Sequence, residues 1–198
     1  MGPRLSGMAL QPGLFEEPTA LPNGLVFQPG FIDAAEEARL LEGIAALGLR
    51  EAQYKQFTAR RRVASFGAGY DYDENELTPA PEIAPFLLPL RERVARWAGV
   101  EPDAFGYALV AEYRPGTPLG WHRDVPQFEM VAGVSVGGTA RMRLRPYPPL
   151  PRGPVFDLEL APRSAYILRG DVRWNWQHSI VATRELRYSI TFRTRRGA

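Results

Sequence analysis

The sequence predicts an α+β fold, mainly β, in which a double-stranded β-helix, or jelly roll, is buttressed by N-terminal helices. Two observations lead to this prediction. Apolar residues with helical spacing occur in the first half of the chain, and short β-type runs fill the second half. At 198 residues, with 45% hydrophobic residues, the chain suits one domain with a sizeable core.

The chain begins with a Gly/Pro-rich stretch, residues 1–30, that we expect to be irregular, and a single domain is expected over residues 31–198. The first residues lack the basic region and long apolar run of a signal peptide. No stretch approaches the roughly 18 apolar residues that a membrane span needs. We therefore expect a soluble, cytoplasmic, monomeric protein without membrane contacts.

Two helices are expected before the strands, as structural support. Asp33 and Glu36 form a capping box, after which apolar residues recur on one helical face as far as Gly48. A second helix is expected over residues 82–97, followed by Gly99, although two prolines near its start are unfavourable to a regular first turn.

The strands are expected in a jelly-roll core of about residues 105–194. Pro/Gly-rich turns separate seven β-type runs: FGYALVAEY, MVAGVSVGG, ARMRLRPY, VFDLEL, SAYILRG, HSIVA and LRYSITFRT. The preceding segment of about residues 51–78 is rich in aromatic and arginine residues. It predicts a hairpin or lid over the mouth of the barrel.

Composition narrows the chemistry. The chain has no cysteine, so disulfides, thiolate zinc sites and cysteine nucleophiles are excluded, and a metal would need nitrogen and oxygen ligands. A net charge of +2 permits a polyanionic partner without demanding one. Arginines cluster at residues 60–62, at alternate positions over 141–145, and at residues 195–196. A hydrated surface explains each cluster at least as well as a phosphate-binding track does.

The two histidines of the chain are His122 and His178, and Asp124 follows the first by two positions. On an extended strand this spacing puts His122 and Asp124 on one face, so that both can reach one metal. His178, at the start of another expected strand, would supply a third ligand. Two histidines and one carboxylate form the facial triad of non-haem Fe(II) enzymes. The alternative is that both histidines only satisfy hydrogen bonds.

The last expected strand, LRYSITFRT, has polar residues on one face: Arg187, Ser189, Thr191 and Arg193. An arginine within an alternating apolar strand loses hydration unless it meets a buried anion, and a guanidinium group matches a carboxylate bidentately. The strand therefore predicts a site for a dicarboxylate. A surface strand with a hydrated polar face is the alternative.

Three motifs, EYRPGTPLGWHRD, WQHSI and RYSITFR, resemble in this order those of the AlkB family of Fe(II)/2-oxoglutarate-dependent dioxygenases. The resemblance covers residues 54–194 and implies a single AlkB-like oxygenase domain that uses Fe(II), 2-oxoglutarate and O2. It implies that the catalytic metal ligands are His122, Asp124 and His178. It also implies that the co-substrate is bound by Arg187, Arg193, Tyr113 and Ser189.

The chain departs from the family pattern at three positions. The family's Asn-x-Tyr reads Ala111-Glu112-Tyr113, and its Arg-Tyr-Asn reads Arg187-Tyr188-Ser189. The loss of both asparagines removes hydrogen bonds to the co-substrate. Pro126 stands where members that repair nucleobases carry an acidic residue. The reaction is therefore better defined than the substrate.

By this resemblance the protein converts 2-oxoglutarate to succinate and CO2 while it dealkylates N-alkylated nucleobases of DNA or RNA, which releases an aldehyde. The run FGAGYDYDE resembles the nucleotide-recognition lid of the family. Candidates for substrate binding are Phe66, Tyr70, Tyr72 and Arg62. Core packing is the competing interpretation of Phe66. Two other functions remain open: hydroxylation or demethylation of a protein or small metabolite, and an inactive jelly-roll binding module.

Overall fold

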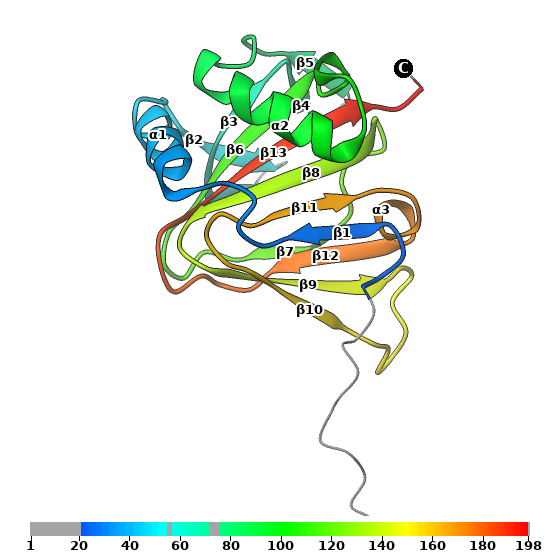
Figure 1. Cartoon of the computed structure of the whole chain (residues 1–198). Coiled ribbons are helices and arrows are strands. Elements are labelled where there is room, and N and C mark those ends of the chain that lie inside the picture. Colours follow the sequence, from blue (N-terminus) through cyan, green and yellow to red (C-terminus); the bar gives the residue numbers. More distant parts are fainter. Residues whose placement is uncertain (1–20, 55–56, 72–75, 198) are drawn as a thin grey trace, which may run out of the picture.

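The computed structural model describes residues 21–54, 57–71 and 76–197 (Figure 1). Among these residues, a large sheet has seven strands in the order β1-β11-β8-β13-β6-β3-β2, and a small sheet has four in the order β10-β9-β12-β7. The two sheets enclose one apolar cluster, and their strand pairs are antiparallel. This arrangement confirms the predicted mainly β, double-stranded β-helix fold.

All seven expected β-type runs form strands, with small shifts at their ends. They are β6 (Tyr107–Tyr113), β8 (Phe128–Gly137), β9 (Ala140–Pro146), β10 (Phe156–Leu160), β11 (Ala165–Leu168), β12 (Trp176–Ile180) and β13 (Arg187–Arg195). Strand β13 lies between β6 and β8 and pairs with both. Its side chains are therefore held by backbone hydrogen bonds on each side.

Two short strands lie outside the seven expected runs. Strand β1 (Leu25–Gln28) lies in the segment predicted to be irregular, and it pairs with β11 to cover one edge of the large sheet. Gly24, which leads into it, has a φ of 87°, and a Cβ there would lie 1.9 Å from the carbonyl oxygen of Arg169. That turn requires glycine. Strand β7 (Leu119–His122) pairs with β12 at the edge of the small sheet.

The 51–78 segment, predicted to be a hairpin or lid, lies in two hairpins. Strands β2 (Arg50–Tyr54) and β3 (Phe57–Phe66) form the expected hairpin, but β3 also pairs with β6 and so extends the large sheet. A second hairpin, formed by β4 (Ala68–Asp71) and β5 (Glu76–Pro79), is a separate two-stranded sheet. The long β3 strand imposes alternation, so neighbouring side chains on it point to opposite faces of the sheet.

Both helices cover the outer face of the large sheet (Figure 1). Helix α1 (Ala34–Ala45) begins as predicted, because the Asp33 side chain accepts a hydrogen bond from the backbone N–H of Glu36. The second helix differs from the prediction: α2 (Leu88–Ala98) follows a 3-10 turn, η1 (Pro85–Leu87). The prolines in and after this turn prevent a regular earlier start.

Two smaller elements complete the fold: the 3-10 turn η2 (Pro102–Ala104) and the short helix α3 (Asp171–Trp174). One apolar cluster lies between the helices and the large sheet, and the other lies between the two sheets. In the described part of the chain, no helix has the length and apolar character needed to cross a membrane.

Candidate metal and co-substrate site

Three potential metal ligands meet between the sheets. His122 ends β7 and His178 lies in the middle of β12, and the two are partners in the strand ladder, with ring centres 4.2 Å apart. Asp124 lies just after β7, and its Oδ2 is 3.6 Å from Nε2 of His178. One potential ligand atom from each residue lies within 4.8 Å of the other two. This arrangement supports the interpretation of the three side chains as a facial triad.

The protonation states of the triad favour metal binding. Nδ1 of His122 lies 2.9 Å from the carbonyl oxygen of Gly120, to which it can only donate, so Nε2 of His122 is left with its lone pair. Burial lowers the pKa of His122 and lowers that of His178 to about 3. Both rings are therefore neutral near pH 7, as metal ligands must be.

Asp124 is ionised for a different reason. Burial alone would raise the pKa of its carboxyl group, but the positive charge of Arg193, helped by that of Arg173, outweighs burial and holds the pKa below its usual range. Nε of Arg193 lies 3.4 Å from Oδ1 of Asp124. One carboxylate oxygen thus faces Arg193 and the other faces His178.

The loop after Asp124 is fixed by Arg173, a residue that the sequence analysis missed. Arg173 lies on α3 and is 3% exposed. Its Nη2 donates to the carbonyl oxygens of Val125 and Phe128, at 2.8 and 2.7 Å. These two bonds hold the chain on the C-terminal side of the Asp124 ligand.

Arg187 is the most unusual buried side chain of the site. It is 1% exposed, and its Nε donates to the hydroxyl of Ser135 on β8 at 3.0 Å. Its two Nη atoms have no hydrogen-bond partner, and no carboxylate pairs with it among the described residues. A buried cation with unused donors is costly unless an anion joins it. The donor set of Arg187 therefore fits a carboxylate.

A cavity of about 1320 Å³ joins Arg187 to the triad. It is large enough for a metal, a small dicarboxylate and part of a larger substrate. The β13 residues predicted to share a face all line it: Arg187, Ser189, Thr191 and Arg193. The buried rings of Tyr113 and Tyr166 also line it, and the guanidinium of Arg187 lies 4.9 Å from the ring centre of Tyr113.

The candidate substrate residues divide into two groups. Tyr70 on β4 lines the cavity, whereas Tyr72 lies outside the described residues. Phe66 does not reach the cavity: it is 6% exposed and packs in the cluster beneath the helices. This position favours the core-packing alternative for Phe66 over a role in substrate binding.

Arg62 is also on the wrong face of β3. Its guanidinium pairs with the carboxylate of buried Glu112 at 2.6 and 2.8 Å, away from the cavity. Its neighbour Arg61 lines the cavity instead, and Nη1 of Arg61 donates to the hydroxyl of Tyr113 at 3.3 Å. The alternation of β3 thus places Arg61, and not Arg62, on the face that lines the cavity.

Comparison with known proteins agrees with this geometry. The model of the family described as "2OG-Fe(II) oxygenase superfamily" matches residues 24–193. The chain belongs to this superfamily. For its members the family implies the use of Fe(II), 2-oxoglutarate and O2.

Several similar proteins are AlkB-like. The ALKBH8 tRNA (carboxymethyluridine(34)-5-O)-methyltransferase of Macaca fascicularis is 28% identical over 82% of this chain and 25% of its own length. The Alkylated DNA repair protein ALKBH8 homolog of Arabidopsis thaliana is 27% identical over 79% of this chain and 50% of its own. An uncharacterized mimivirus protein, L905, is 33% identical over 43% of this chain and 46% of its own. The chain thus spans half or less of the curated relatives that it matches.

Solved structures show the same fold. That of OsALKBH1 superposes with a TM-score of 0.67 at 16% identity, covering 89% of this chain and all of the other. A Pseudomonas putida prolyl-4-hydroxylase superposes with a TM-score of 0.59 at 17% identity, over 87% of this chain and 93% of the other. At these identities the likeness concerns the fold alone.

Proposed function

We propose that this chain is a 2-oxoglutarate-dependent dioxygenase that oxidatively dealkylates N-alkylated nucleobases in DNA or RNA. The observation that carries the enzymatic part is Arg187, a buried cation whose two Nη atoms are unpaired at the wall of the cavity that also contains the triad. A metal site alone would need no such group. Paired with a dicarboxylate co-substrate, Arg187 gains the anion that its burial requires.

Different residues of the site would bind the metal and the co-substrate. His122, Asp124 and His178 would hold Fe(II), which supplies the activation of O2 and the oxidation of the substrate. The remote carboxylate of 2-oxoglutarate would accept hydrogen bonds from the Nη atoms of Arg187 and from Tyr113. Near the metal, Arg193 keeps Asp124 ionised and can turn toward the co-substrate, because its contacts with Asp124 are long, at 3.4 and 3.5 Å.

Ser189 lines the same wall, where the AlkB family has an asparagine. Its hydroxyl is shorter and has fewer donors than an amide, so it offers the co-substrate a weaker contact. Ser135 compensates in part because it fixes Nε of Arg187 and thereby aims the two Nη atoms. We expect the affinity for 2-oxoglutarate to depend more on Arg187 than on Ser189.

The nucleobase assignment rests on the mouth of the cavity and on the relatives. Tyr70 and Arg61 line the cavity, where a flipped base could stack on the ring and form hydrogen bonds with the guanidinium group. The named relatives include a tRNA methyltransferase and an alkylated DNA repair protein. An N-alkyl group that is hydroxylated on the carbon next to nitrogen separates as an aldehyde, without a protein nucleophile.

The test is a coupled assay on matched oligonucleotides. Succinate and aldehyde should form in equal amounts from a methylated oligonucleotide, and only uncoupled succinate should form from the same sequence without the methyl group. If an oligonucleotide stimulates succinate formation but no aldehyde appears, the reaction is hydroxylation and not dealkylation. Stimulation by peptides or metabolites but by no oligonucleotide would contradict the proposed substrate and favour the protein or metabolite alternative.

A further inference from the structure

Guanidinium groups lie over aromatic rings around the mouth of the cavity. Three of these pairs form what we call the rim. The distance from the guanidinium carbon to the ring centre is 4.1 Å for Arg123 over Tyr147, 4.2 Å for Arg145 over Trp121 and 4.6 Å for Arg196 over Trp174. All three rings line the cavity, and so does Arg123. The rim therefore borders the path by which a substrate reaches the triad.

The rim arginines lack acidic partners. In the part of the chain that the structure describes, Arg123 donates to the backbone carbonyl of Trp174 at 3.2 Å, and Arg145 donates to the neutral amide oxygen of Gln177 at 2.9 and 3.1 Å. Neither these two arginines nor Arg196 forms an ion pair there. The nearby carboxylate of Glu129 accepts a hydrogen bond from Trp174 instead.

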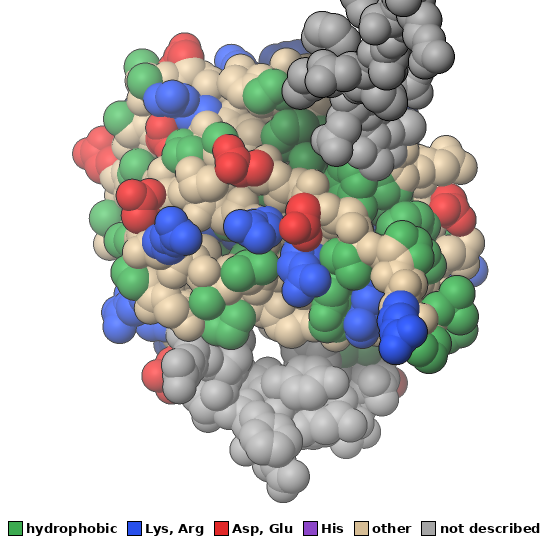
Figure 2. Space-filling model, turned by 90° about the horizontal axis from the view of Figure 1, so that it is seen from below, with side chains coloured by type: hydrophobic (Ala, Val, Ile, Leu, Met, Phe, Trp, Pro, Cys, Tyr) green, Lys and Arg blue, Asp and Glu red, His purple; other side chains and the backbone are tan. Residues whose placement is uncertain are grey.

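Other arginines on the small sheet have an acidic partner. Arg141 and Arg143 on β9 lie 3.9 and 3.5 Å from the carboxylate of Asp157 on β10. They follow the same alternation as Arg145, two residues further along the strand. Arg145, at the end of β9, has no ion-pair partner among the described residues. Figure 2, seen from below, shows basic side chains across this face, with acidic side chains beside several of them.

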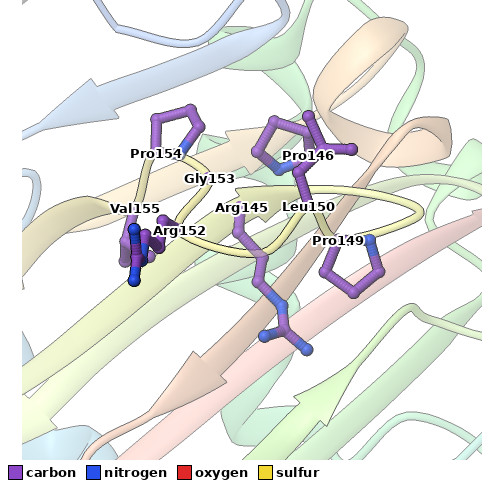
Figure 3. Close-up of a pocket in the computed structure, with 8 residues that line it drawn as sticks. All are labelled: Arg145, Pro146, Pro149, Leu150, Arg152, Gly153, Pro154 and Val155. Carbon is purple, nitrogen blue, oxygen red and sulfur yellow. The ribbon is translucent and has the colours of Figure 1, made fainter.

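Arg145 also borders a second hollow, of about 210 Å³, formed by the proline-rich loop between β9 and β10. Figure 3 shows that its side chain extends from the strand away from Pro146 and Pro154. Arg152 lines the far part of this hollow, and Tyr147 in the same loop is 42% exposed. The basic and aromatic surface thus continues outward from the cavity.

The ring contacts have a physical consequence. A free arginine side chain loses rotamer entropy when it is fixed on a ligand. A guanidinium already held on a ring loses less of it, so a new contact with an anion costs less. Phosphate oxygens suit the planar fork of donors that the guanidinium offers. The rim is therefore preorganised for a series of phosphates.

We propose that the rim binds the sugar-phosphate backbone of single-stranded nucleic acid on either side of the nucleotide that enters the cavity. Arg123, Arg145 and Arg196 contact phosphates, and the rings beside them stack neighbouring bases. An acidic peptide would use the cations but would gain little from three aromatic rings, so the rings favour a nucleic acid. This inference rests on the proposed function, because it takes a nucleic acid as the substrate.

Fluorescence anisotropy of a labelled, unmodified single-stranded oligonucleotide of about 12 nucleotides tests the rim. The full chain is titrated at several salt concentrations beside Arg123→Gln, Arg145→Gln and the matched control Arg141→Gln. Each rim variant should weaken binding about tenfold and reduce the slope of log K against log salt by about 0.7, the value for one phosphate contact on a single strand. Arg141→Gln should bind like the unaltered chain, since Arg141 pairs with Asp157 and lies opposite Glu159 on β10.

The outcomes separate the rim from the proposed substrate. The unaltered chain could bind the oligonucleotide with a steep salt slope while both rim variants bind it as tightly as the unaltered chain does. That result would contradict the role of the rim and leave the nucleic-acid substrate in place. If the unaltered chain binds polyglutamate but no oligonucleotide, both the rim assignment and the nucleobase substrate fail. Trp121→Ala, which keeps every charge, should also weaken binding because Arg145 loses its support; if this variant does not fold, Arg145→Gln still decides.

Discussion

The inner and outer parts of the cavity are built differently. In the inner part, Arg187, Arg193 and His178 lie on strands with neighbours on both sides: β12 lies between β9 and β7, and β13 lies between β8 and β6. His122 and Asp124 lie at and just after the end of β7, where the pairing with β12 and the bonds from Arg173 hold them. The outer part is built from the small hairpin β4–β5, the residues of β7 before His122, and loops. Chemistry that tolerates little movement is thus held by the sheets. Substrate recognition lies in loops and edge elements, where substitutions reduce the stability of the fold least.

The largest effect is expected from removal of a metal ligand. His122→Ala, Asp124→Ala or His178→Ala should abolish succinate formation and leave the circular dichroism spectrum unchanged, because the sheets form without the metal. Asp157→Asn, which removes an exposed carboxylate outside the cavity, should keep full activity. Substantial succinate production by any of the three alanine variants would contradict the assignment of these residues as ligands of the catalytic iron.

Replacement of Arg187 should strongly weaken the binding of 2-oxoglutarate and leave metal binding unchanged. Truncating one partner of a buried, charge-assisted pair costs about 3–5 kcal/mol, so Arg187→Ala should weaken 2-oxoglutarate binding by about two to three orders of magnitude in calorimetry. Binding of the metal should stay intact, and Arg187→Lys should rescue only part of the loss. Unchanged affinity in Arg187→Ala would contradict the role given to this strand.

Arg187→Met gives the same region a second, independent readout. The substitution removes an uncompensated buried charge, so the protein without co-substrate should melt at the same or a higher temperature. The unaltered protein should gain about 2.7 kcal/mol from 2-oxoglutarate at a hundred times its Kd, and the variant should gain almost nothing. If both proteins are stabilised equally, the co-substrate binds elsewhere.

Phe66 and Tyr70 test the boundary between core and mouth. Phe66→Ala should destabilise the protein by about 3–5 kcal/mol, because Phe66 fills the cluster under the helices. Tyr70→Ala should leave the melting temperature nearly unchanged and weaken oligonucleotide substrates by about 1–3 kcal/mol, while uncoupled decarboxylation survives. A Tyr70 variant that turns over methylated oligonucleotides normally would exclude stacking by this residue.

The smallest expected effect comes from two adjacent arginines on opposite faces of β3. Arg61→Gln should raise the KM for 2-oxoglutarate about fivefold, the worth of one hydrogen bond, because Arg61 contacts Tyr113. Arg62→Gln should instead lower the melting temperature, because buried Glu112 loses its bidentate partner. The reverse pattern in these two variants would mean that the faces of β3 are wrongly assigned.

The inner part could be predicted from the sequence because its signals are periodic. Alternation over LRYSITFRT placed Arg187 and Arg193 on one face, and the structure confirms that face as a cavity wall. The His-x-Asp spacing brought His122 and Asp124 together even though Asp124 follows β7 and is not part of it. In both cases the prediction depends on the spacing of residues two positions apart on an extended chain, and this spacing can be read from the sequence.

The outer part could not be predicted in the same way. Phe66 and Arg62 were assigned to the substrate because β3 was not recognised as a strand of the large sheet, and without a strand their faces were undefined. Strand β1 is four residues long, too short for a clear alternation. Arg173, Ser135 and the rim act through contacts between residues far apart in the chain, for which the sequence carries no local signal.

The most direct test is a crystal structure of the protein prepared with Fe(II) and 2-oxoglutarate in the absence of oxygen. We predict iron bonded to His122, Asp124 and His178, and a 2-oxoglutarate whose remote carboxylate lies within hydrogen-bond distance of both Nη atoms of Arg187. Iron bound elsewhere, or a co-substrate that leaves those Nη atoms unpaired, would contradict it.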